Sequence, residues 1–119
     1  ACTVDDEAVK IKFDKGYKWV GGKTAEKALA IEDNKNTLEL PNVGNFKDGD
    51  AFSFGAWIYL PKRGMNGAVF SRMNEAKDFR GWDLWLQADR IGTHIISAWP
   101  ENALKVVAKT PLKPKQWHH

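Results

Sequence analysis

The chain has 119 residues, of which 43% are hydrophobic and 28% are charged, and its formal net charge is +3. This length fits one domain spanning residues 1–119, and the composition excludes an intrinsically disordered chain. The 18 lysines and arginines are scattered, so the sequence shows neither the basic stripe nor the reading motif of a nucleic-acid-binding protein. Cys2 is the only cysteine, which excludes an internal disulfide, and no apolar run approaches the length of a membrane span.

Short alternating runs of apolar and polar residues recur along the chain, and no stretch has helical periodicity. In the first half they predict strands at residues 9–13, 17–20, 27–31 and 37–40. Gly21 and Gly22 are interpreted as a break after the second of these strands. Residues 32–36 are a polar cluster rich in turn formers, so the third and fourth strands are predicted to form a hairpin.

The strongest predicted strand covers residues 51–60. One face carries an apolar row, which we call the phenylalanine row: Phe52, Phe54, Ala56, Ile58 and Leu60. The other face carries a second row: Ser53, Gly55, Trp57 and Tyr59. The phenylalanine row is predicted to be core. The second row is either another buried layer or a partly exposed aromatic surface.

The second half predicts strands at residues 68–71, 80–88, 91–99 and 103–108, with a polar loop at 74–79 that could hold one helical turn. Asp89 and Arg90 are interpreted as the tight connection of a hairpin. The strand at 80–88 places Trp82, Leu84 and Leu86 on one side and Asp83, Trp85 and Gln87 on the other. Regularly spaced short strands without helices predict an all-β antiparallel sandwich or barrel.

Several motifs, in this order, resemble those of concanavalin A-like, laminin-G-type domains. The run DAFSFGAWIY at 50–59 resembles the family's FS-x-x-x-W-(V/I) strand, and residues 27–41 are similar to its opening. GAVFSR at 67–72 and RGWDLWL at 80–86 are similar to two later strands, and QWHH at 116–119 looks like the start of another. The resemblance implies an antiparallel concanavalin A-like jelly-roll sandwich.

In that family the domain continues beyond the QWHH strand, so the resemblance implies that this chain is the N-terminal two-thirds of a domain, incomplete at its C-terminus. Within this family, the motifs are most similar to those of modules in large secreted or periplasmic planctomycete-type proteins that also carry cytochrome-like domains. This implies an extracellular or periplasmic location. The alternative for His118 and His119 is the remnant of a purification tag. If the native chain ends here, an exposed sheet edge is expected to pair with a second copy or with the missing segment, and a homodimer is expected.

No enzyme chemistry is predicted, and no catalytic residue is assigned. Glycoside hydrolases on this fold need two carboxylates, often as E-x-D-x-E in one strand, and the sequence has no such triplet. It also lacks a G-x-S-x-G elbow and the histidine spacing of a zinc site. His94 lies in a predicted strand and is interpreted as a hydrogen-bonded structural residue.

Calcium is the cofactor that the resemblance suggests, because this fold family often binds it at the rim of the sheets. Oxygen ligands from a loop suit this cation, and the candidate ligands are Asp33, Asn34 and Asn36. The alternative for this loop is a simple turn.

Six tryptophans exceed what a core of this size readily buries, so some are predicted to be exposed. A sugar presents an apolar C–H face and a hydroxyl rim, so a carbohydrate site needs aromatic rings beside polar side chains. The predicted ligand-binding residues are Trp85, Asp83, Gln87, Arg80, Trp99, Arg72 and Trp57. Interior packing is the alternative for Trp57 and Trp82. Arg72 and Arg80 would favour an acidic or sulfated glycan.

The sequence therefore leaves three functions open. A non-catalytic carbohydrate-binding module of a larger extracytoplasmic protein is favoured by the tryptophans and by the resemblance. A structural, protein-interaction or oligomerisation module is the alternative, in which exposed aromatic residues bind a neighbour. A glycoside hydrolase is the third, and its acids are not found.

Overall fold

The computed structural model describes residues 2–4, 7–9, 11, 17–32, 38–40, 42–47 and 49–119. The chain divides into two compact units, residues 1–54 and 55–119, and each is described by itself. The prediction of a single domain over the whole chain stays a prediction.

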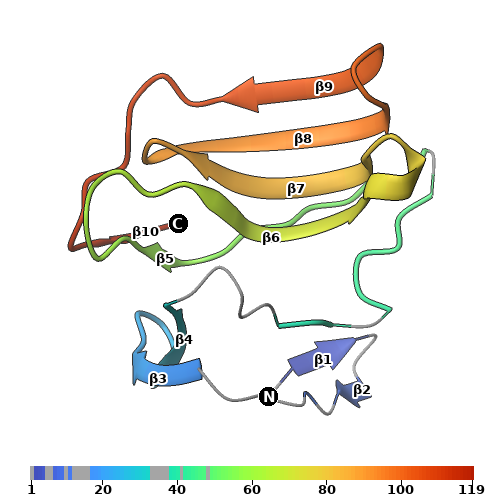
Figure 1. The fold of residues 1–119 in the computed structure, drawn as a ribbon. Coiled ribbons are helices and arrows are strands. Elements are labelled where there is room, and N and C mark those ends of the chain that lie inside the picture. Colours follow the sequence, from blue (N-terminus) through green and yellow to red (C-terminus); the bar gives the residue numbers. More distant parts are fainter. Residues whose placement is uncertain are drawn as a thin grey trace. The chain divides into compact units, whose positions relative to one another are not determined.

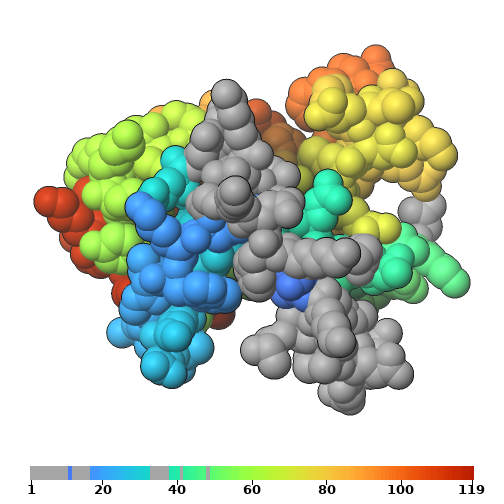
Figure 2. Space-filling model, turned by 60° about the horizontal axis from the view of Figure 1, so that its bottom comes forward, coloured from blue at the N-terminus to red at the C-terminus, as the bar shows by residue number. Residues whose placement is uncertain are grey.

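The first unit contains two antiparallel strand pairs (Figure 1). Strand β1 (Cys2–Val4) pairs with β2 (Glu7–Val9), and β3 (Tyr17–Gly21) pairs with β4 (Lys27–Ile31). The β3–β4 hairpin lies at the surface in Figure 2, where it is coloured blue to cyan, and its Trp19 is 55% exposed. The predicted strand at 9–13 lies largely outside the described residues.

The predicted hairpin of residues 27–31 with 37–40 is wrong in its partner. Strand β4 pairs with the strand that precedes it, and residues 38–40 form no strand, while Thr37 lies outside the described residues. The reason lies in the turn: Gly22 N–H donates to Glu26 O at 3.2 Å, and a Cβ on Gly22 would stand 2.3 Å from Ala25 O. The glycine that was interpreted as a break therefore begins the hairpin turn, because only glycine fits that approach.

The second unit is built on a four-stranded antiparallel sheet in the order β6-β7-β8-β9 (Figure 1). Its strands are β6 (Gly67–Asn74), β7 (Arg80–Gln87), β8 (Arg90–Ala98) and β9 (Asn102–Val107). A short 3₁₀ helix, η1 (Glu75–Lys77), occupies the predicted helical turn between β6 and β7. Ala88 and Asp89 both have positive φ, as a two-residue hairpin turn requires, so the predicted β7–β8 hairpin is confirmed with its turn one residue earlier.

The long strand predicted at 51–60 is confirmed in its alternation but not in its length. Leu60 is 2% exposed, the other residues of the phenylalanine row are half-buried, and Trp57 and Tyr59 of the opposite row are exposed. Only β5 (Ile58–Tyr59) is a strand, paired with β10 (Trp117–His118). A segment forms a strand only where a partner strand bonds its N–H and C=O groups. Among the described residues that partner is β10, which pairs with two residues only, so β5 is short.

The all-β, antiparallel class is confirmed, since the described residues contain no α-helix. They form one four-stranded and three two-stranded sheets, and no closed sandwich or jelly roll is among these arrangements. The described part of the chain holds no helix with the length and apolar character needed to cross a membrane.

Candidate functional site

Strand register decides which of the predicted site residues share a surface. Asp83 stands opposite His94 on β8, Trp85 opposite Gly92, and Gln87 opposite Arg90. Directly opposite residues of an antiparallel pair point to the same side of the sheet. The predicted row Asp83, Trp85 and Gln87 therefore shares one face with His94; we call this the Asp83 face.

Arg72 and Arg80 lie on the opposite face. Arg72 stands opposite Trp82, and Asn74 stands opposite Arg80, so both arginines share the side of Trp82. The rings of Phe70 and Trp82 also meet there, edge to face, at 6.0 Å between centroids. Because side chains alternate along each strand, the register does not bring these two arginines together with Asp83, Trp85 and Gln87.

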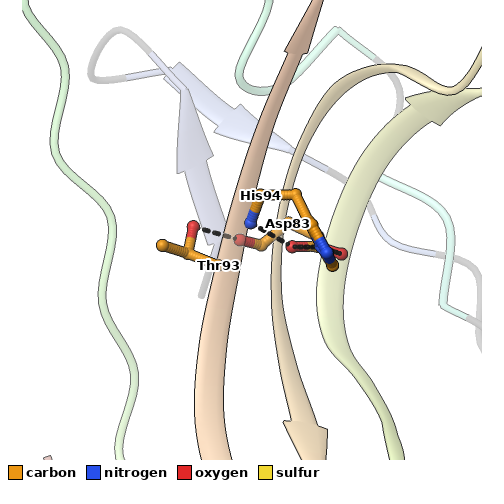
Figure 3. Close-up of polar contacts among 3 residues, drawn as sticks. All are labelled: Asp83, Thr93 and His94. Carbon is orange, nitrogen blue, oxygen red and sulfur yellow. Dashed lines mark hydrogen bonds and ion pairs between the residues drawn. The ribbon is translucent and has the colours of Figure 1, made fainter. Parts of the chain in front are cut away.

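Asp83 was predicted to bind a ligand, which requires an accessible side chain. The structure instead buries it. It is 7% exposed, and its Oδ1 accepts the backbone N–H of His94 at 2.8 Å. The Nδ1 of His94 lies 3.0 Å from Oδ2 and 3.1 Å from Oδ1, and the Thr93 hydroxyl donates to the backbone carbonyl of Asp83 at 2.7 Å (Figure 3). A buried carboxylate needs such donors. Asp83 therefore positions His94.

Three aromatic rings follow one another on the Asp83 face. The ring of Trp85 stacks on that of His94 at 5.0 Å between centroids and 21° between planes. The ring of Trp99 meets His94 edge to face at 5.9 Å and 85°, and Trp99 is 43% exposed. Lys105, opposite His94 on β9, holds its Nζ 5.0 Å from the centroid of Trp85. We call the three aromatic rings the Trp85–His94–Trp99 row.

Gly92 makes room for the Trp85 indole. A Cβ on Gly92 would lie 2.7 Å from Trp85 Nε1 and 3.0 Å from the backbone oxygen of Val106. Trp85 Nε1 is buried there and, among the described residues, has no hydrogen-bond partner. The indole therefore lies against bare backbone, and its position depends on the missing side chain.

Trp57 belongs to a different surface. Its ring meets that of His119 at 5.0 Å, and the ring of Tyr59 meets that of Trp117 at 5.5 Å. These four residues form an aromatic ladder along β5 and β10 and the residues next to them, and Trp57 is 40% exposed. The interior alternative is therefore wrong for Trp57, whereas Trp82 is half-buried and packs on Phe70.

The candidate calcium ligands Asp33, Asn34 and Asn36 lie outside the described residues, so calcium binding stays a prediction. Among the residues that the structure describes, no group of three or more His, Cys, Asp and Glu side chains could hold a metal ion. His118 makes a hydrogen bond within the fold: its Nε2–H donates to the Lys113 carbonyl at 2.8 Å.

Asp89 is a second buried carboxylate, at a position where the sequence predicts only a turn. Its Oδ2 accepts the N–H of Gly64 at 2.9 Å, and its Oδ1 accepts the N–H of Met65 at 2.7 Å. These two backbone hydrogen bonds lower the pKa of Asp89, and the charges of Arg63 and Arg90 lower it further. Asp89 therefore fastens the β7–β8 turn to the segment before β6.

Sequence reasoning missed Lys105 and gave His94 only a structural role. The structural role of His94 is confirmed by its bonds to Asp83. Its place between two indoles follows from the β7–β8 register and from the chain path after β8, which no local motif shows. Comparison of the chain with protein-family models, with curated proteins and with solved structures found no match.

Proposed function

We propose that this chain is a non-catalytic carbohydrate-binding module of a larger extracytoplasmic protein. The observation that carries the proposal is the Trp85–His94–Trp99 row on the Asp83 face. Consecutive rings offer apolar area to the C–H face of a sugar, and the polar groups around them can bond its hydroxyls. Lys105 and the exposed Gln87 stand on the same face as the row.

Binding without cleavage fits the carboxylates of this sheet. Asp83 is the only acidic residue in β7, β8 and β9, and its oxygens are held by His94. Glycoside hydrolysis uses two carboxyl groups, about 5–9.5 Å apart, that flank the scissile bond. We therefore propose a binding role for the row.

The resemblance to laminin-G-type domains supplies the remaining parts of the proposal. These are a jelly-roll sandwich, an extracellular or periplasmic location, and calcium held by Asp33, Asn34 and Asn36. An acidic or sulfated glycan loses the support of Arg72 and Arg80, because both lie on the other face.

A glycan array followed by affinity electrophoresis tests the proposal. The wild-type chain is compared with Trp99→Ala, and with Trp57→Ala as a matched control, because both tryptophans are exposed to a similar degree. We expect retardation by the glycan that the array identifies, loss of retardation in Trp99→Ala, and no change in Trp57→Ala. Retention of binding in Trp99→Ala would remove the row from the site, and loss only in Trp57→Ala would move the site to the aromatic ladder.

One observation favours the alternative of a protein-interaction or oligomerisation module. On the face opposite the row, Ile95 of β8 stands directly across from Leu104 of β9, and Val106 lies next along that edge strand. These three side chains are 43%, 54% and 53% exposed. Exposed apolar patches often mark association surfaces. Molar mass in solution tests this alternative: an oligomer that Leu104→Lys dissociates would favour it, and a monomer at high concentration would contradict it.

A further inference from the structure

The hydrogen bonds of His94 determine which of its ring nitrogens carries the proton. A carboxylate only accepts hydrogen bonds, and Nδ1 of His94 lies 3.0 and 3.1 Å from the two carboxylate oxygens of Asp83. Nδ1 must therefore carry the hydrogen. In the neutral ring the other nitrogen, Nε2, then has a lone pair and no hydrogen.

We infer that His94 Nε2 is the hydrogen-bond acceptor of the proposed glycan site and that it takes a hydroxyl hydrogen of a neutral sugar. This inference rests on the proposed function, since it concerns the same row of rings. Trp99 is exposed and meets the imidazole edge to face at 5.9 Å, so a sugar stacked on the Trp99 indole brings its hydroxyl rim towards His94. The His94 side chain is 13% exposed, and in this proposal Nε2 accepts that hydroxyl hydrogen.

One anion and two cations share the face of His94, so the preference for a neutral sugar rests on the hydrogen-bonding polarity of Nε2 and not on charge. Asp83 holds His94 from β7, and Lys105 is the directly opposite residue on β9. The Lys105 ammonium lies over the Trp85 ring, and Arg90, on the same face, donates its Nε–H to the Lys109 carbonyl at 3.2 Å. A carboxylate or sulfate oxygen at Nε2 would bring two acceptors together without a hydrogen between them, which is unfavourable.

Asp83→Asn is expected to reverse the polarity of Nε2 without changing the shape of the site. Oδ1 of Asp83 accepts the backbone N–H of His94 at 2.8 Å, so the amide oxygen of Asn takes this place. Its NH₂ group then stands at the position of Oδ2, 3.0 Å from Nδ1, and donates to that nitrogen. The hydrogen of the ring moves to Nε2, as it does when the aspartate of a serine-protease triad is replaced by asparagine.

Long-range ¹H–¹⁵N correlation spectra of the histidine rings test the tautomer without any ligand. The chain has three histidines, and the signals of His94 are identified as those that are missing from the spectrum of His94→Gln. We expect the protonated-type ¹⁵N shift at Nδ1 in the wild type and at Nε2 in Asp83→Asn. Asp89→Asn is the matched control, since it alters the other buried aspartate in the described part of the chain and should leave the signals of His94 unchanged. A wild-type ring protonated at Nε2 at neutral pH would overturn the inference.

Binding of two purified oligosaccharides tests the ligand class. Calorimetry compares cellohexaose, which is neutral, with hexagalacturonate, which carries a carboxylate on each ring. We expect the wild type to prefer cellohexaose, and Asp83→Asn to shift the ratio of the two affinities by about tenfold towards the acid, the effect of one hydrogen bond. An unchanged ratio with the tautomer reversed would overturn the role of Nε2. Failure to bind either sugar, with the wild-type tautomer as inferred and no ligand on the array, would overturn the proposed function instead.

Discussion

Asp89 accepts the backbone N–H of Met65 at 2.7 Å, although the two residues belong to different connections of the second unit. Asp89 N–H in turn donates to Met65 O at 3.0 Å, so the two residues are joined in both directions. The carbonyl of Asp89 also accepts the N–H of Leu112 at 2.8 Å. A single turn residue thus ties the β7–β8 hairpin to two other segments of the chain.

This arrangement predicts a loss of stability in acid. The pKa of Asp89 is lower in the folded chain than in the unfolded chain, because Gly64 and Met65 donate hydrogen bonds to the ionised carboxylate. Its contribution is therefore present above about pH 4 and is lost as the pH falls through the lowered pKa. Thermal unfolding at pH 7 and pH 3 measures the effect: Asp89→Asn should reduce the melting temperature more at pH 7. An equal reduction at both pH values would contradict the role of the charge.

Gly92→Ala should destabilise the second unit by about 1–3 kcal/mol, the usual cost of overpacking. The new Cβ would meet both the Trp85 indole and the backbone of β9. Urea unfolding monitored by tryptophan fluorescence measures this change. Gly21→Ala is the control, since a Cβ there would meet no atom within 4 Å. Equal effects of the two substitutions would contradict the steric account.

Lys105→Gln should lower stability by about 0.5–1 kcal/mol, because the ammonium loses its place over the Trp85 ring, whereas an arginine at this position should retain most of the contribution. The residue is exposed, so packing changes little. Chemical unfolding of the three chains measures the difference, and Lys77→Gln on η1 supplies a charge-matched control. Destabilisation of the Arg variant as large as that of the Gln variant would show that positive charge above the ring is not what matters.

Leu60→Ala should cost about 2–5 kcal/mol, whereas Leu104→Ala should stay within about 0.5 kcal/mol of the wild type. Leu60 is 2% exposed, at the end of the alternating row that begins at Phe52, and Leu104 is 54% exposed. Denaturant midpoints of the two alanine variants measure the contrast. A cost for Leu104→Ala that matches the cost for Leu60→Ala would mean that the apolar face of β9 is covered in solution.

The sequence predicted well the features that depend on neighbours along the chain. Alternation of side chains is a property of extended backbone itself, so the row of Phe52 to Leu60 and the common face of Asp83, Trp85 and Gln87 could be read directly. The β7–β8 hairpin was also predicted, because its turn residues and its alternating flanks are adjacent in sequence. These parts need no information about distant segments.

The candidate site depended on choices that are not local. Strand β4 chose β3 as its partner, and an irregularity in register between Ala68 and Phe70 accompanies the pairing that sets Arg72 beside Trp82. A shift of one residue moves every following side chain to the other face, and nothing in the local sequence of β6 reports it.

The sequence by itself determined that this chain would form short antiparallel strands with one apolar and one mixed face, because side-chain alternation and turn chemistry act over a few residues. Only the tertiary structure decided that His94 would lie between Trp85 and Trp99 with Asp83 beneath it. That decision depends on how three segments align across a sheet and around its edge. Alignment of this kind is set by the summed pairing and packing of whole strands, which no single stretch of residues contains.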